Sequence, residues 1–214
     1  MFLEPRRLPS PAAERWTPRF TRWDIAMVAC LVLIASSALL SLWQRLHGRD
    51  SDPSPATAFN MVLTFAMTGG VPFLWLVKTR ARPLAGTLDY LRMRNLRRAA
   101  PFGIAIGVGL AVMAMIALRT APTWPPDAGV LRGLLFWVVL GPLGEEILFR
   151  GILQVRIGLI GQALAFAALH VAALSPIQAA VVAVAGLLLG VASRRWGLWA
   201  SIVAHATYNF IAIL

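Results

Sequence analysis

The sequence predicts an all-α fold, a polytopic membrane helix bundle of about seven transmembrane helices with the N-terminus inside and the C-terminus outside. Of the 214 residues, 58% are hydrophobic and only 14% are charged, whereas soluble domains carry about 25% charged residues. The mean hydropathy is +0.71, and the apolar residues gather in stretches of 18 residues or more. No ten-residue segment alternates as a membrane strand does, so a β-barrel is not expected.

Seven apolar stretches are each long enough to cross a bilayer, because 18 residues at 1.5 Å per residue cover roughly 27 Å. Only helices satisfy their own backbone there. The stretches are residues 25–43, 59–77, 101–118, 133–155, 157–174, 176–193 and 197–214. Residues 1–23 are expected to be a basic cytoplasmic tail, since the run that follows is too long for a signal peptide. Residues 24–214 are expected to form a single transmembrane domain.

The distribution of basic residues gives the orientation. With the N-terminus inside, 15 Lys and Arg fall on the inner side and four on the outer side, as the positive-inside rule requires. Residues 79–100 mix leucines with arginines and are expected to lie on an anionic inner leaflet, with a solvated basic loop as the alternative. The expected location is a bacterial cytoplasmic membrane. The net charge of +11 does not indicate nucleic acid, because little polar surface is left to bind it.

Six polar residues inside the last four stretches need an explanation, because an ionisable group in a membrane helix costs at least about 2.5–3.5 kcal/mol. They are Glu145, Glu146, Arg150, His170, His205 and Asn209. A lone membrane histidine is more often a packing residue, but six polar groups at one depth indicate a functional site.

Spacing along the helices divides these residues into roles. Glu146 and Arg150 are four residues apart and are expected to pair. Glu145 points about 100° away and is left free for chemistry. If Arg150 is buried by its partner and the helix continues to Arg156, Glu145 lies roughly 16 Å deep.

The other members of the set are expected at a similar depth. His170 lies 13 residues from the same surface, roughly 20 Å, while His205 and Asn209 share one face of the last helix. Gly141 and Pro142 should loosen the helix just before the acidic pair. Gly186 and Gly190 form a small-xxx-small step that is typical of close helix packing.

The residue types favour hydrolysis by a carboxylate. The sequence has no His-Glu-x-x-His motif, no deep aspartate pair and no Ser–Lys dyad. A glutamate in a dry pocket can act as general base on a water, while His and Asn stabilise the oxyanion. The rival interpretation is a zinc site formed by Glu145, His170 and His205, which lacks the usual ligand spacing. No cofactor is otherwise expected.

Three ordered motifs resemble those of the CAAX protease and bacteriocin-processing family (CPBP, or Abi) of intramembrane endopeptidases. They are Glu145-Glu146-x-x-x-Arg150, Phe166-x-x-x-His170 and His205-x-x-x-Asn209. The resemblance implies a catalytic core within residues 130–214. It also implies that Glu145 and His170 activate water, that His205 and Asn209 form the oxyanion hole, and that Glu146 and Arg150 support the site.

The resemblance also implies an activity. The founding members cleave prenylated CAAX proteins at the cytoplasmic face, and many bacterial members process other peptides or confer bacteriocin immunity. The expected function is therefore glutamate- and histidine-dependent endoproteolysis near that face, on a peptide or membrane-protein substrate. One alternative is a non-proteolytic immunity or scaffold protein of the same fold. An ion or metal transporter is a third, weaker alternative.

Overall fold

The structure is a computed structural model that describes residues 21–47, 63–79, 84–93, 95–119, 135–171 and 176–213. All regular secondary structure in these ranges is helical, which confirms the predicted all-α class. The α-helices are α1 (Arg22–Leu46), α3 (Val71–Thr79), α4 (Leu84–Tyr90), α5 (Leu96–Leu118), α7 (Gly141–Glu146), α8 (Gln154–Val171), α9 (Pro176–Trp196) and α10 (Leu198–Ile213). Three π-helical segments are η2 (Ala66–Gly70), η3 (Leu135–Leu140) and η4 (Ile147–Leu153).

The helices follow the predicted stretches, and each of the seven overlaps helix in the described residues. Three helical segments of the described chain are long and apolar enough to cross a membrane, namely Leu96–Leu118, Leu135–His170 and Ile177–Trp196. The protein is therefore a multi-pass membrane protein, while the total of seven spans and their orientation stay predictions. Nearly all of the predicted tail 1–23 lies outside the described residues.

The long segment Leu135–His170 combines two predicted spans, and its backbone turns at Gly158. This glycine has φ 76° and ψ 179°, a conformation that residues with a Cβ rarely adopt. The turn lies two residues beyond Arg156, where the sequence predicted the end of the helix. The helix therefore continues past Arg150, which is the condition under which Glu145 was predicted to lie deep in the membrane.

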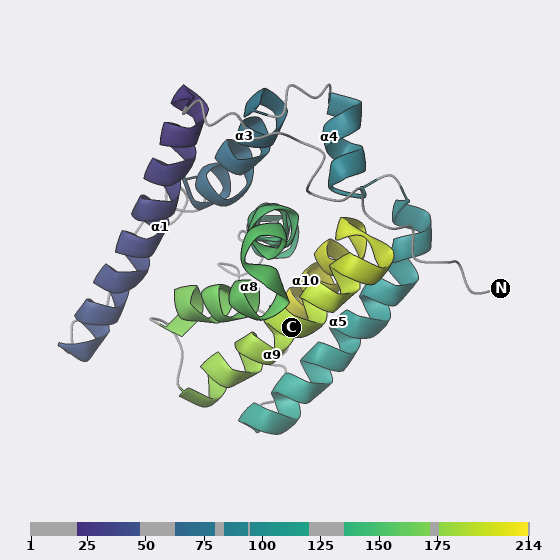
Figure 1. Ribbon diagram of the computed structural model, residues 1–214. Coiled ribbons are helices and arrows are strands. Elements are labelled where there is room, and N and C mark those ends of the chain that lie inside the picture. The colour runs from purple at the N-terminus through teal and green to yellow at the C-terminus, as the bar shows by residue number, and fades with distance from the viewer. Residues whose placement is uncertain are drawn as a thin grey trace.

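Helices α5 and α10 run side by side, and α1 lies at the edge of the molecule beside α3 (Figure 1). Two glycines of α5 allow the close approach of α10. A Cβ on Gly103 would lie 2.8 Å from the carbonyl oxygen of Ala200, and one on Gly107 would lie 2.5 Å from that of Ala204. The backbone of α10, which carries His205 and Asn209, is thus held directly against α5.

Two prolines follow π-helical segments. Pro72 lies just after η2 and Pro142 just after η3. A proline lacks the N–H of a regular helix and its ring crowds the carbonyl one turn earlier, and a wider turn accommodates both defects. The expectation that Pro142 loosens the helix before the acidic pair is confirmed. Close beside it, Gly144 packs on η2, since a Cβ there would lie 2.6 Å from the Thr68 hydroxyl.

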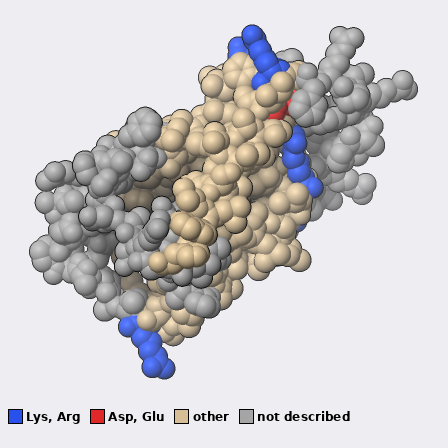
Figure 2. Space-filling view, turned by 90° about the vertical axis from the view of Figure 1, so that its left-hand side faces the viewer, with Lys and Arg blue, Asp and Glu red and all other residues tan. Residues whose placement is uncertain are grey.

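The outer surface of the bundle is apolar. On α5, Ile104, Val108, Val112 and Ile116 are exposed at intervals of four residues, so they form one lipid-facing stripe. A broad uncharged band covers the face seen in Figure 2, and Lys and Arg lie toward its ends. This pattern fits a helix bundle surrounded by hydrocarbon.

One end of the bundle is fixed by polar contacts among three helices. Asp24 accepts hydrogen bonds from the backbone N–H of Thr21 at 2.8 Å and from the indole of Trp75 at 3.0 Å. The guanidinium of Arg156 lies over the Trp75 ring, 4.6 Å from its centre. The bond from Thr21, then that from Trp75, holds the pKa of Asp24 below its ordinary value.

A second set of contacts ties the segment after α4 to the connection between α9 and α10. Arg92 donates to the carbonyl oxygens of Ser193, at 3.5 Å, and Arg194. Gly197, with φ 90°, lets the backbone of Arg92 approach, because a Cβ there would lie 2.6 Å from the Arg92 carbonyl oxygen. Basic residues that the charge count placed on one side therefore lie together.

Candidate active site

The candidate residues come from four elements. Glu145 and Glu146 end α7, Arg150 lies in η4, His170 is near the end of α8, and His205 and Asn209 are on α10. The π-helical segments on both sides of α7 and the close α5–α10 contact set the rotation of the helices that carry them.

Glu146 is the centre of a buried ion pair. Its Oε1 lies 2.7 Å from Nη1 of Arg150, and neither side chain is exposed. The guanidinium also lies 4.4 Å from the centre of the Phe166 ring and donates to the carbonyl oxygen of Gly186 at 3.4 Å. The pair expected from the four-residue spacing is confirmed.

His205 contacts the same carboxylate from the opposite helix. Its Nδ1 lies 3.0 Å from Oε1 of Glu146. Because a carboxylate paired with arginine only accepts hydrogen bonds, Nδ1 must carry a proton. The other nitrogen, Nε2, lies 4.0 Å from Oε2 of Glu145, so the imidazole stands between the two carboxylates.

Glu145 differs from its neighbour in both exposure and partners. Its side chain is 22% exposed, and its Oε2 has no hydrogen-bond partner in the described part of the chain. The adjacent glutamates therefore have different environments. Glu146 is paired with Arg150 inside the bundle, while one oxygen of Glu145 accepts no hydrogen bond from the described residues.

His170 reaches this cluster only through an aromatic ring. Its Nδ1 lies 2.8 Å from the carbonyl oxygen of Phe166, which can only accept, so Nε2 carries the lone pair in the neutral ring. Phe166 lies against both imidazoles, with ring centres 4.7 Å from His170 and 5.8 Å from His205. No hydrogen bond or ion pair joins His170 to Glu145.

Asn209 lies one turn beyond His205 on α10 and donates to the carbonyl oxygen of Trp137 in η3 at 2.8 Å. One of its two N–H groups is thereby used. The structure thus joins Glu145, Glu146, Arg150 and His205 by direct contacts, with His170 and Asn209 at the edges of the group.

Sequence reasoning missed two buried amides beside the site. The side chains of Gln154 and Gln162 are almost fully buried and donate to carbonyl oxygens of α9. The available signal was the occurrence of two glutamines inside otherwise apolar stretches.

The zinc alternative needs Glu145, His170 and His205 to converge. Among the described residues, no group of three or more His, Cys, Asp or Glu is arranged to hold a metal ion. The donor set of these three residues does not fit a zinc site in this arrangement.

Residues 127–211 match the family model described as Type II CAAX prenyl endopeptidase Rce1-like, and all six candidate residues fall within this range. No similar chain was found among the curated proteins or the solved structures.

Proposed function

We propose that this multi-pass membrane protein is an intramembrane endopeptidase. The premise is that residues 127–211 form a domain of the Rce1-like type II CAAX prenyl endopeptidase family (CPBP/Abi). The protein hydrolyses a peptide bond of a peptide or membrane protein near the cytoplasmic face. The observation that carries the proposal is the position of Glu145. Its unpartnered Oε2 faces the imidazole of His205 at 4.0 Å.

The separation of these two atoms suits one water molecule. It is too long for a direct hydrogen bond, but a single water can contact both atoms. Glu145 takes a proton from this water as the water oxygen attacks the scissile carbonyl carbon. The same proton then passes to the amine nitrogen as the C–N bond breaks.

The two histidines act from their different hydrogen bonds. The bond to Phe166 leaves Nε2 of His170 as an acceptor that orients the water beside Glu145. When His205 is protonated, its Nδ1 donates to Glu146 and its Nε2 donates to the developing oxyanion. The free N–H of Asn209 is the second oxyanion donor.

Arg150 and Glu146 act as positioning residues, because Arg150 pairs with Glu146 and Glu146 accepts a hydrogen bond from Nδ1 of His205. They hold His205 in place without contacting the substrate.

The test is cleavage of a membrane-proteome-derived peptide library by purified protein, with and without a zinc chelator. Glu145→Gln should lower the rate at least about 100-fold, the lower range for a lost general base, while the melting temperature stays unchanged. The matched control is Asp89→Asn, the same carboxyl-to-amide change at an exposed residue of α4, which should cleave as wild type does.

Three results would contradict the proposal. Normal cleavage by Glu145→Gln would show that Glu145 is not the general base. Loss of activity with the chelator would favour a metal-dependent mechanism. Absence of cleavage by the wild type, together with a lower melting temperature of Glu145→Gln, would favour the scaffold or immunity function.

A further inference from the structure

Most of the buried polar atoms without hydrogen-bond partners belong to the candidate site and to the residues beside it. Six buried side-chain nitrogen or oxygen atoms of the described residues have no hydrogen-bond partner. Five of them belong to the site and its surroundings: Glu145 Oε2, Glu146 Oε2, Arg150 Nε, Gln154 Oε1 and Gln162 Oε1. The sixth is the hydroxyl of Thr87 on α4.

The spacing and contacts of these residues place them in order. Glu146, Arg150 and Gln154 follow one another at intervals of four along η4 and its two ends, slightly less than one turn of a π-helix each, so they lie toward the same side of the segment. Gln162, beyond the turn at Gly158, joins them from the side. Its Nε2 donates at 2.9 Å to the carbonyl oxygen of Gly186, the same atom that Arg150 contacts.

The α9 helix provides room for these side chains. Gln154 donates to the carbonyl oxygen of Gly190 at 3.2 Å. A Cβ on Gly190 would lie 2.7 Å from both Oε1 of Gln154 and Nε2 of Gln162. The Gly186–Gly190 step therefore does more than let two helices pack, since Gly190 faces two amides.

A line of unpartnered polar atoms in a protein interior is typically satisfied by bound water. Bulk solvent does not reach these side chains, because four of the residues that carry them have exposures between 0% and 6%, namely Glu146, Arg150, Gln154 and Gln162. We propose that a file of internal waters lies between the η4–α8 segment and α9, bonded to Arg150 Nε, Gln154 Oε1 and Gln162 Oε1.

The file has a direction and a use. It begins beside Gln154, next to the exposed residues Val155 and Arg156, and ends at the two carboxylates. It thus provides a route by which water reaches the site from the polar end of the bundle, behind Arg150. That it supplies the water consumed in hydrolysis rests on the proposed function.

The first test is a crystal structure of the wild type in lipid at a resolution that shows water. We expect water oxygens within about 3 Å of at least two of the three named atoms. Direct bonds from these atoms to protein groups, or an empty seam, would overturn the proposal. This result does not depend on whether the protein cleaves any peptide.

The second test concerns the supply of water. Gln154→Leu and Gln162→Leu should each lower kcat about tenfold with KM for the peptide unchanged, the pattern of a step after binding. Gly190→Ala, whose methyl group would displace the side chains of Leu159, Gln154 and Gln162, should act in the same direction if the leucine variants fail to fold. The control Thr87→Val removes the unpartnered hydroxyl outside the file and should leave kcat unchanged.

The two tests separate the possible failures. Water in the structure with unchanged kcat in the variants would overturn the supply role. Water in the structure with no cleavage by the wild type would confirm the file and contradict the proposed function.

Discussion

Glu146 and Arg150 form a fully buried ion pair, and the stability of the protein should depend on both members. Removing one member of a buried pair leaves an uncompensated charge and destabilises a protein by about 3–5 kcal/mol. We expect this loss for Arg150→Met. The double variant Glu146→Gln/Arg150→Met should recover most of it, because no charge is then left unpaired.

Chemical unfolding of the wild type, both single variants and the double variant in detergent micelles measures the coupling between the two residues. Glu145→Gln is the matched control, because it leaves the Glu146–Arg150 pair intact and the Oε2 of Glu145 accepts no hydrogen bond from the described residues, so its stability should fall much less than that of the single variants of the pair. Additive losses in the two single variants would show that the pair is solvated.

For single residues, the sequence predicts contacts within a helix but not those between helices. The Glu146–Arg150 pair follows from a spacing of four. The bond between His205 and Glu146 joins residues 59 positions apart and depends on how α10 is rotated against α7. The catalytic roles of the six residues stay predictions, since contacts alone do not test them.

Between helices, the contact of α5 with α10 determines where His205 lies. The methyl group of Gly107→Ala would meet the backbone carbonyl of Ala204, which cannot turn away as a side chain does. We expect a loss of about 1–3 kcal/mol in stability, typical of overpacking, and a loss of activity as α10 is displaced.

The same helix offers a matched control in Gly109, whose Cβ would meet nothing within 4 Å. Gly109→Ala should keep full activity and gain up to about 1 kcal/mol, because alanine favours helix over glycine. Melting temperatures and cleavage rates of both variants test the contact. Equal behaviour of the two would show that the helices do not approach as described.

The sequence predicts the positions of these helices better than their internal geometry. Apolar length placed helix in each of the seven stretches, and Gly141–Pro142 indicated a loosened turn. The π-helical form of that turn, and the break at Gly158 rather than at Arg156, result from backbone geometry that apolar periodicity does not encode.

For the molecule as a whole, the junction of α1, α3 and α8 predicts a dependence of stability on pH. The contacts at Asp24 hold its pKa below the ordinary value of about 3.9. Their stabilisation is therefore present above that pH and is lost as the pH falls through the folded-state pKa.

Asp24→Asn should accordingly melt below the wild type at pH 7, with the difference shrinking as the pH falls below about 4 and vanishing once Asp24 is protonated in the folded state. Melting curves of both proteins across this range measure it. A constant difference at all pH values would show that the carboxylate charge plays no part.

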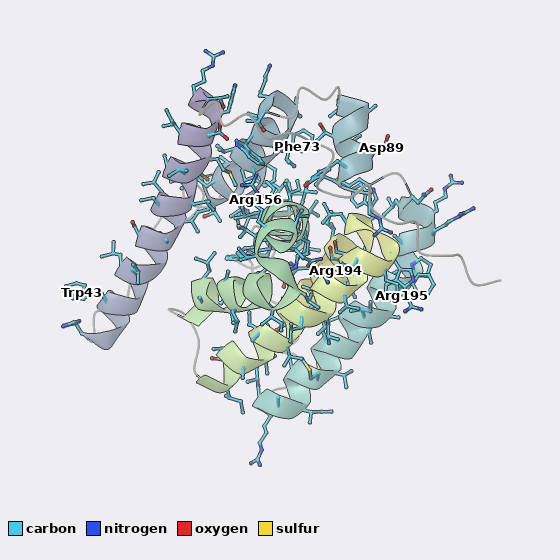
Figure 3. All side chains as sticks on the ribbon, in the orientation of Figure 1. Trp43, Phe73, Asp89, Arg156, Arg194 and Arg195 are labelled. Carbon is cyan, nitrogen blue, oxygen red and sulfur yellow. The ribbon has the colours of Figure 1, made fainter. Side chains whose placement is uncertain are left out.

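The orientation of the whole bundle is the remaining prediction, and two exposed residues test it. His47 follows α1, whose end near Trp43 lies far from Arg156 (Figure 3). Asn95 lies just before α5, within residues 79–100, which are expected to lie on the inner leaflet. The charge bias places His47 outside and Asn95 inside the cell.

Replacing either residue by cysteine leaves the count of Lys and Arg unchanged, and the native Cys30 is buried. A maleimide that does not cross membranes should label His47→Cys in intact cells. It should label Asn95→Cys only after permeabilisation, and the reverse pattern would place the Glu145 site at the opposite face.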